Sequence, residues 1–269
     1  MPGGARDSSK TRVKPVFDFL WAQRELWVRR LLELPRGGCP DARIADGDLS
    51  PLEGFWEPTE KQLNPPVSLL SWMIRNAGSL RPARDAGRGD PADDRRQRLR
   101  AGEPAVVEEA IRLLRSEARP KGWHIFEGPT SPDVFLVTPE ALIVVEGKRT
   151  EPGPTTYTTW LEGRHQIWRH IDAAWEVRGR RAVYGFFIVE GDSSGERHRL
   201  PEVWSEACLN CLTDAALETS FPHRSEAEAR AISRCFPGAT TWQGVCETFG
   251  IAWQDLPDRV PVAPSAGAP

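Results

Sequence analysis

The sequence lacks several features that would place it in common classes of membrane, secreted or catalytic proteins. None of its apolar runs approaches the length of a membrane span. Residues 1–14 have no apolar core of the kind found in signal peptides, so we expect a cytoplasmic protein. There is no internal repeat, glycine-rich phosphate loop, serine nucleophile motif or zinc-type spacing of histidine and cysteine. Repeat architectures and several familiar catalytic designs are therefore excluded.

Net charge is also small. The chain has 269 residues, of which 39% are hydrophobic and 27% charged, and its formal net charge is −3. This composition is typical of a globular chain with one sizeable core and appendages. A weakly acidic chain does not coat DNA by charge alone. Any nucleic-acid contact must come from basic residues that are concentrated locally.

The spacing of apolar and turn residues predicts five segments. We expect a disordered N-terminus (1–14), a helical extension with a charged linker (15–98), a core (99–192), a helical C-terminal extension (193–255) and a disordered tail (256–269). Within these segments we predict helices over 15–34, 67–76, 103–118, 159–178, 203–218, 225–235 and 240–250. Strands are predicted over 122–127 and 181–190, with a hairpin over 133–148.

The hairpin carries the strongest chemical signal in the chain. Asp133 opens one apolar run, and Glu146 and Lys148 close the next one. The turn between the two strands brings Asp133 opposite the end that carries Glu146 and Lys148. Glu146 and Lys148 are two residues apart on one strand, so their side chains share a face. Two carboxylates and an ammonium group should therefore converge.

These three groups suit hydrolysis of a phosphodiester bond. Carboxylate oxygens bind Mg²⁺ or Mn²⁺, which polarises a phosphoryl oxygen and acidifies a water molecule. A lysine can orient that water or neutralise charge in the transition state. The alternative is a hairpin whose charged residues simply face solvent. The position of the charges at the end of an apolar strand pair argues against that alternative.

Pro132-Asp133 together with Glu146-Gly147-Lys148 resembles the motif of the PD-(D/E)XK nuclease superfamily. The order of predicted elements around it, αβββαβ over about residues 103–190, matches the core order of that superfamily. Residues 122–148 look most like Holliday-junction resolvases and restriction endonucleases. The resemblance implies an α/β fold with a restriction-endonuclease-like core, a mixed central sheet and helical additions at both ends.

The resemblance also implies roles for individual residues. Asp133 and Glu146 would be ligands of Mg²⁺ or Mn²⁺, with the Gly147 carbonyl able to complete the coordination sphere, and Lys148 would position the attacking water. RecB-like members often carry Gln, then Tyr four residues later, on the helix after the motif. In those members the two residues help hold the substrate. This sequence has Gln166, which is therefore a candidate catalytic residue, but His170 takes the place of the tyrosine and leaves the second contact open.

Further residues are candidates for contacts with nucleic acid. Guanidinium, hydroxyl and aromatic groups near the motif suit phosphate contacts and stacking; they are Arg149, Thr155, Tyr157, Arg164, Arg169 and His170. The alternatives are a solvated basic helix face for the arginines and helix capping by Thr158 or Thr159.

Superfamily members often add a glutamate from the first core helix. Val107, Ala110, Ile111, Leu114 and Ala118 form the apolar stripe of the predicted 103–118 helix. Glu103 lies near the middle of that stripe, so we expect it to face the sheet as a third catalytic carboxylate. The competing interpretation is that Glu103 only caps the helix.

The five cysteines form an odd set without secretory context, so reduced thiols are expected. Some RecB-type nucleases hold an iron-sulphur cluster with one cysteine before the core and three after it. Cys39 precedes the core here, and Cys208, Cys211 and Cys235 follow it. The long gap between Cys211 and Cys235 favours ordinary burial over a cluster.

We therefore expect a divalent-metal-dependent nuclease that acts on nucleic acid, with DNA as the expected substrate and no membrane contact. One alternative is a catalytically silent nucleic-acid-binding or assembly module on the same fold. Another is a subunit whose partner recognises the DNA. The sequence leaves open endonuclease or exonuclease action, DNA or RNA, sequence preference, and a homodimer or larger complex.

Overall fold

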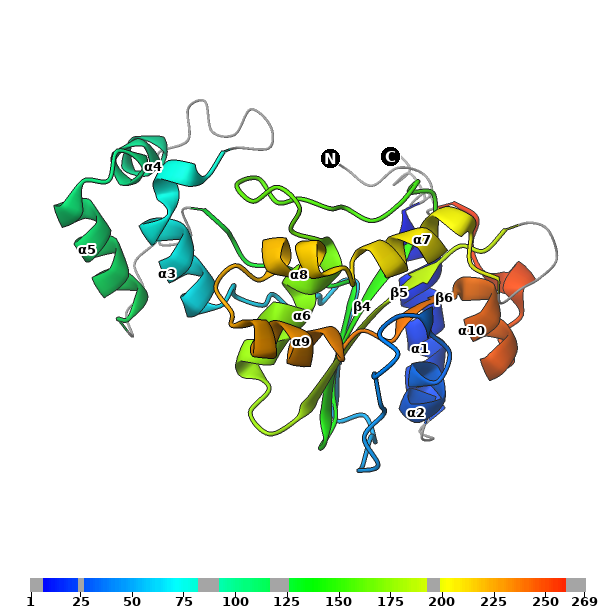
Figure 1. Ribbon diagram of the computed structural model, residues 1–269. Coiled ribbons are helices and arrows are strands. Elements are labelled where there is room, and N and C mark those ends of the chain that lie inside the picture. The colour runs from blue at the N-terminus through cyan, green and yellow to red at the C-terminus, as the bar shows by residue number, and fades with distance from the viewer. Residues whose placement is uncertain (1–6, 24–26, 82–91, 117–125, 193–198, 260–269) are drawn as a thin grey trace, which may run out of the picture.

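The computed structural model describes residues 7–23, 27–81, 92–116, 126–192 and 199–259. The chain is an α/β protein whose six-stranded mixed sheet is covered by helices on both faces (Figure 1). In the part of the chain that the structure describes, no helix combines the length and apolar character needed to cross a membrane.

The sheet has the strand order β1-β6-β5-β4-β3-β2. β3 (Val134–Val137) and β4 (Ala141–Lys148) form the predicted antiparallel hairpin. β4, β5 (Ala182–Val189) and β6 (Gly238–Thr241) are mutually parallel. The two edges are short antiparallel strands, β1 (Arg36–Gly37) on β6 and β2 (Glu53–Phe55) on β3. The central strands are apolar on both sides because helices bury both faces.

Alternate side chains of the central strands enter two different cores. Val134, Ile143 and Val145 face the first core with side chains of the N-terminal helices and of α10. Those elements are η1 (Ser9–Val13), α1 (Lys14–Ala22), α2 (Trp27–Leu32) and α10 (Trp242–Phe249). Phe135 and Val144 face the second core. That core is covered by α6 (Gln166–Val177), α7 (Glu202–Asn210), α8 (Asp214–Ser220) and α9 (Glu226–Ser233).

A helical lobe lies to one side of the sheet, at the left of Figure 1. It consists of α3 (Val67–Arg75), η2 (Ala77–Ser79), α4 (Asp93–Arg100) and α5 (Pro104–Leu114). These helices form a third core of their own, to which Phe126 and Trp160 also contribute. The lobe is inserted between β2 and β3. A last short helix, η3 (Trp253–Asp255), follows α10.

Several sequence predictions of elements are confirmed. The 133–148 hairpin and the 181–190 strand are present, and α9 and α10 fall within two residues of the expected bounds. The 15–34 and 203–218 helices are present but each is divided in two. The expected 159–178 helix begins only at Gln166, with His165 as its N-cap, so neither Thr158 nor Thr159 caps it.

Other predictions are wrong. Residues 9–13, expected to be disordered, form a π-helix in which Thr11, Arg12 and Val13 are buried, because Val13 enters the first core and Arg12 pairs with Glu190 after β5. Part of the expected charged linker is α4, whose Leu99 enters the third core. β2 lies within the expected 15–98 extension, for which no strand was predicted, and β6 was not predicted either. Most of the predicted 122–127 strand lies outside the described residues, and Phe126 and Glu127 are not in a strand.

Candidate active site

The charged end of the β3–β4 hairpin brings together the residues singled out by the motif. Val134 pairs with Val145, so the next residues outward, Asp133 and Glu146, lie at the same end of the two strands. Lys148 donates from Nζ to Glu146 Oε1 at 2.6 Å. The Glu146 and Lys148 side chains are 4% and 13% exposed, so this pair is largely removed from water.

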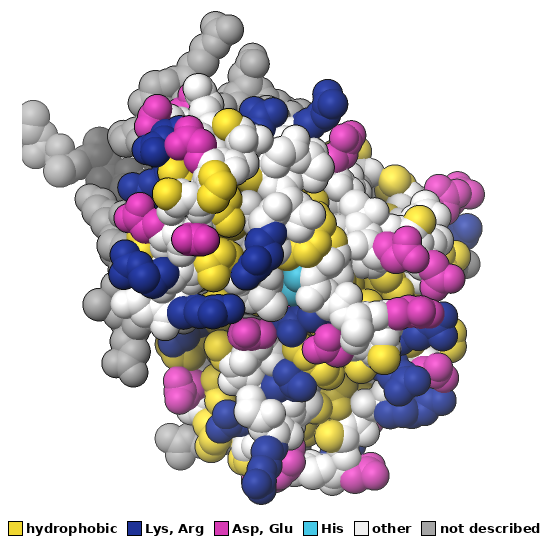
Figure 2. Space-filling model, turned by 60° about the vertical axis from the view of Figure 1, so that its left-hand side comes forward, with side chains coloured by type: hydrophobic (Ala, Val, Ile, Leu, Met, Phe, Trp, Pro, Cys, Tyr) yellow, Lys and Arg dark blue, Asp and Glu magenta, His cyan; other side chains and the backbone are white. Residues whose placement is uncertain are grey.

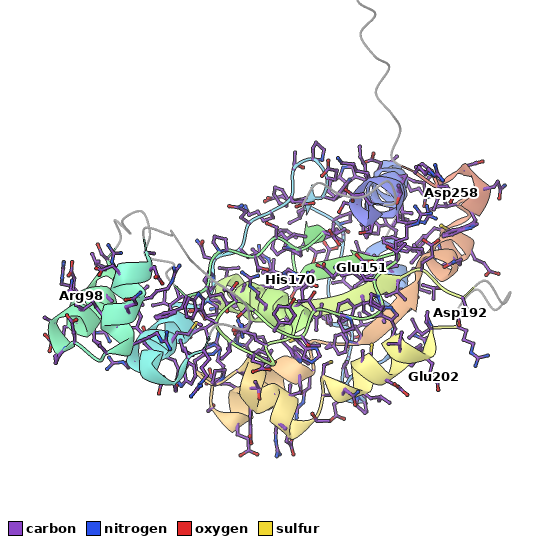
Figure 3. All side chains as sticks on the ribbon, turned by 90° about the horizontal axis from the view of Figure 1, so that it is seen from above. Arg98, Glu151, His170, Asp192, Glu202 and Asp258 are labelled. Carbon is purple, nitrogen blue, oxygen red and sulfur yellow. The ribbon has the colours of Figure 1, made fainter. Side chains whose placement is uncertain are left out.

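Helix α6 supplies two more groups to Glu146. Gln166 Nε2 donates to Glu146 Oε1 at 2.6 Å. His170, one helical turn later, has its Nε2 atom 3.0 Å from Glu146 Oε2. Its other ring nitrogen is hydrogen-bonded to Thr130 Oγ1 at 2.9 Å. Residues four apart share a helix face, which is why Gln166 and His170 reach the same carboxylate. In Figure 3, His170 lies near the middle of the molecule, between Arg98 on the lobe and Glu202 at the far end.

Asp133 is held from the opposite side. The Gly147 backbone N–H donates to Asp133 Oδ2 at 2.8 Å, and Ser9 Oγ donates to Oδ1 at 3.0 Å. Ser9 begins the π-helix η1, an unusual element that is frequent at functional sites. A side chain at Gly147 would meet Val13 Cγ2 at 2.7 Å and Trp242 Cζ2 at 2.8 Å. Only glycine fits between Glu146 and Lys148 in this packing.

Burial and neighbouring charges shift the protonation of the two carboxylates in opposite directions. Burial, reinforced by the charge of Glu146, raises the pKa of Asp133 to about 8. Burial alone would also raise the pKa of Glu146, but His170 and Lys148 outweigh it and hold that pKa at about 2. Burial opposes the charged form of Lys148, yet the Glu146 carboxylate raises its pKa. A divalent cation would relieve the repulsion between Asp133 and Glu146.

The donor set suits a hard cation. Two carboxylates meet here, and the Gln166 side-chain oxygen is buried without a hydrogen-bond partner. Within the described ranges, no group of three or more His, Cys, Asp or Glu side chains is arranged to hold a metal ion. Two carboxylates are nevertheless enough for Mg²⁺, which usually keeps several water ligands.

Further acids gather at this end of the sheet, and the sequence patterns did not reveal them. Phe55, the last residue of β2, pairs with Phe135, and Glu57 and Glu60 follow it in the chain. Burial together with the charges of Glu57, Glu146 and Asp7 raises the pKa of Glu60. Ser9 and Thr130 were also missed. No local sequence pattern singles these two residues out, because each reaches the site only through contacts with residues far away in the chain.

Glu103 does not join the site. It is the N-cap residue of α5, and its carboxylate pairs with Arg98 at 2.9 Å, with 44% of the side chain exposed. The apolar stripe of α5 is buried, but against α3 and α4 in the lobe rather than against the sheet. The expectation that Glu103 faces the sheet is therefore wrong. An apolar stripe predicts that one helix face is buried, but it does not predict which element that face packs against.

Three arginines proposed to contact nucleic acid are engaged within the protein instead. Arg149, 5% exposed, pairs with Glu190 and Asp258. Arg164 is fully buried between Glu127 and Asp172. Arg169 donates to the carbonyls of Gly128 and Pro129 and pairs with Glu127. These arginines fasten the segment before Asp133 and the C-terminal end of β4, so they support the site rather than face a ligand.

The remaining candidates are divided. His170 is buried and part of the cluster on Glu146, so it does not present a nucleic-acid surface. Thr155 is exposed, and its carbonyl accepts a hydrogen bond from the Gln166 N–H that opens α6. Tyr157 is half-buried and forms an isolated β-bridge with Glu162. Both lie on the segment between β4 and α6, beside the cluster.

The cysteines pack in apolar surroundings. Cys208, Cys211 and Cys235 are buried in the second core. Burial raises the pKa of the Cys208 and Cys235 thiols to about 12, and that of Cys211 is raised as well. An iron-sulphur cluster needs thiolates, which this environment disfavours. The packing thus supports burial as the role of these three residues.

Comparisons with protein-family models, with curated proteins and with solved structures give no match to this chain.

Proposed function

We propose that this chain is a divalent-metal-dependent nuclease of the PD-(D/E)XK type that hydrolyses phosphodiester bonds, with DNA as the preferred substrate. The observation that carries the proposal is the convergence of Asp133, Glu146 and Lys148 at the end of one hairpin, with Gln166 from the following helix on the same carboxylate. Perturbed, buried ionisable groups of this kind cluster at functional sites.

The order of elements supports the same proposal in a revised form. α1, β2, β3, β4, α6 and β5 occur in the order αβββαβ when two parts of the chain are treated as insertions: α2 with β1, between α1 and β2, and the helical lobe, between β2 and β3. In this assignment the first core helix is α1, which packs on the sheet, and not the 103–118 helix. Asp7 and Ser9 then replace Glu103 as the polar residues that the N-terminal helical segment brings to the site.

Asp133 and Glu146 would hold Mg²⁺ or Mn²⁺. The cation would supply charge stabilisation at the phosphoryl oxygen and a more acidic water. The chain itself fixes the carboxylates: Gly147 N–H and Ser9 orient Asp133, while Gln166 and His170 orient Glu146. Such supporting contacts keep reacting groups in a productive geometry.

Lys148 contributes a positive charge at a fixed position. Its ammonium group forms an ion pair with Glu146 Oε1 within a largely buried cluster. From there it can donate a hydrogen bond to the attacking water or to a phosphate oxygen in which charge develops. A donor that is preorganised in a site of low dielectric stabilises the transition state more than the same donor in water.

Cleavage of linear, circular and branched DNA and RNA in the presence of Mg²⁺, Mn²⁺ or EDTA tests the proposal. We expect Asp133→Asn and Lys148→Ala to reduce cleavage by about a hundredfold or more, because each removes a ligand or a stabilising charge. EDTA should abolish cleavage by the wild-type protein.

Matched controls are available on the same protein. Glu140→Gln neutralises an exposed acid at the turn end of the hairpin, and Lys14→Ala removes an exposed lysine that pairs with Asp18. Both should cleave like the wild type. Cleavage by folded Asp133→Asn at the wild-type rate would rule out the assigned site. Nucleic-acid binding without cleavage under any metal would instead favour the catalytically silent binding module.

A further inference from the structure

The helical lobe is basic although the whole chain is weakly acidic. Over its described residues, 67–81 and 92–115, arginines outnumber the acidic residues, and lysine does not occur. Figure 2 turns this side of the molecule toward the viewer and shows Lys and Arg side chains interspersed with Asp and Glu. Local concentration of basic residues is what a weakly acidic protein needs in order to bind a polyanion.

Three of these arginines surround one hollow. A depression of about 310 Å³ between α3 and α5 is lined by Arg75, Val107, Glu108, Ile111, Arg112 and Arg115. Val107 and Ile111 give it an aliphatic floor, and Glu108 is the one acidic side chain among its described lining residues. We call this depression the arginine groove. Its three guanidinium groups outweigh the single carboxylate.

The arginines of the groove differ from those near the candidate active site. Arg75, Arg112 and Arg115 are exposed, and no ion pair or hydrogen bond of their side chains occurs within the described ranges. Elsewhere on the lobe, Arg98 pairs with Glu103, and Arg96 stacks over Trp160 with 5.4 Å between the guanidinium carbon and the ring centroid. The charges of the groove arginines are therefore not engaged within the described part of the folded protein, whereas those of Arg96 and Arg98 are.

Favourable interaction with helix dipoles offers a simpler account of their position. Arg75 and Arg112 lie in the last turns of α3 and α5, where the helix dipole favours a cation. That account explains one arginine at each helix end. It does not explain why two helix ends and a third arginine line one hollow in which Glu108 is the one acid among the described lining residues.

The lobe is anchored beside the candidate active site. Phe126 and Trp160 enter the core of the lobe and form an edge-to-face pair with centroids 5.5 Å apart. Phe126 precedes Thr130 and Asp133 in the chain, and Trp160 lies on the segment that leads into Gln166. The lobe therefore packs against the two segments that lead to Asp133 and to Gln166. A polyanion bound to the lobe would be attached to the same part of the molecule.

We infer that the arginine groove binds the phosphodiester backbone of the nucleic-acid substrate, an inference that rests on the proposed nuclease function. Guanidinium groups bind phosphate through paired hydrogen bonds as well as by charge. The aliphatic floor suits the sugars. Such contacts position a strand without reading its sequence.

The test measures binding of fluorescently labelled duplex and single-stranded DNA by anisotropy in EDTA, where no cleavage occurs, at several salt concentrations. The variant Arg75→Gln, Arg112→Gln, Arg115→Gln should bind about tenfold more weakly or worse, equally for unrelated sequences. The slope of log K against log salt should decrease by about 3, close to one unit for each lost phosphate contact.

Two matched variants complete the design. Arg180→Gln, Arg230→Gln, Arg234→Gln removes the same charge at exposed sites before β5, on α9 and directly after α9, and should bind like the wild type. Replacing the three groove arginines by lysine retains the charge and should restore most of the salt slope. Equal losses in the groove and control variants, no loss in the groove variant, or no DNA binding by the wild type would each overturn the inference.

The two proposals fail in different ways. If the chain cleaves DNA with Mg²⁺ and the groove variant binds normally, the groove inference is wrong and the nuclease proposal stands. If binding depends on the groove but no metal supports cleavage, the nuclease proposal is wrong and the groove remains a phosphate-binding surface.

Discussion

Gly147 occupies the point where the candidate site meets the N-terminal helices. Its missing side chain leaves room for Val13 and Trp242, and its N–H holds Asp133. The residue therefore combines a packing role with a role in orienting a ligand carboxylate. This explains why a motif position between two charged residues needs the smallest side chain.

Gly147→Ala should destabilise the folded protein by about 1–3 kcal/mol, the usual range for overpacking, because Val13 and Trp242 would both have to shift. This exceeds the gain of about 0.4–1 kcal/mol from a less flexible unfolded chain. Urea unfolding measures the effect. Gly128→Ala is the control, since its new methyl group meets nothing within 4 Å. Equal stability of the two variants would contradict the packing argument.

At the scale of elements, a buried ionic network ties α6 to the chain around α8 and α9. Asp172 on α6 accepts from Arg164 at 3.1 Å and from Arg224 at 2.9 Å, and His223 Nε2 lies 3.2 Å from it. Arg164 also pairs with Glu127, just before the segment that carries Thr130. The network thus fixes the helix that presents Gln166 and His170 to Glu146.

Asp172→Asn should lower the free energy of unfolding by about 3–5 kcal/mol, because it leaves the buried Arg164 with less compensation. Thermal denaturation detects this as a clear drop in Tm. Glu176→Gln tests the same helix and the same partner Arg224 at a site where the side chain is 38% exposed. There we expect at most about 1 kcal/mol. If both variants lose the same stability, the network does not have the role assigned to it.

Elements defined by local patterns were predictable, and elements defined by distant pairing were not. The apolar runs of β3, β4 and β5 and the turn between β3 and β4 fixed the positions of Asp133, Glu146 and Lys148. β2 has three residues and β6 has only Gly, Ala and Thr, so neither has a strand-like pattern of its own. Ser9 and Glu60 reach the site only through such long-range contacts.

For the whole molecule, the same network predicts how stability depends on pH. Although burial opposes it, His223, Arg164 and Arg224 lower the pKa of Asp172 from 3.8 to about 2. A lowered pKa means stability that is complete above the unfolded value and lost as the pH falls through the folded value. The stability difference between wild type and Asp172→Asn should therefore shrink by on the order of 2 kcal/mol between pH 5 and pH 2. A constant difference in urea titrations would contradict this.

Both edges of the sheet are formed by one stretch of chain, residues 36–55, as β1 and β2. Each is only two or three residues long, and Lys61 covers Phe55 on β2. Short edges offer another chain few free N–H and C=O groups, whereas β3, which lies behind β2, is an apolar strand that would expose a longer row of them. Residues 36–55 thereby prevent the sheet from pairing edge to edge with a neighbouring molecule. A fragment that begins after residue 55 would lack β1 and β2 and should aggregate more readily.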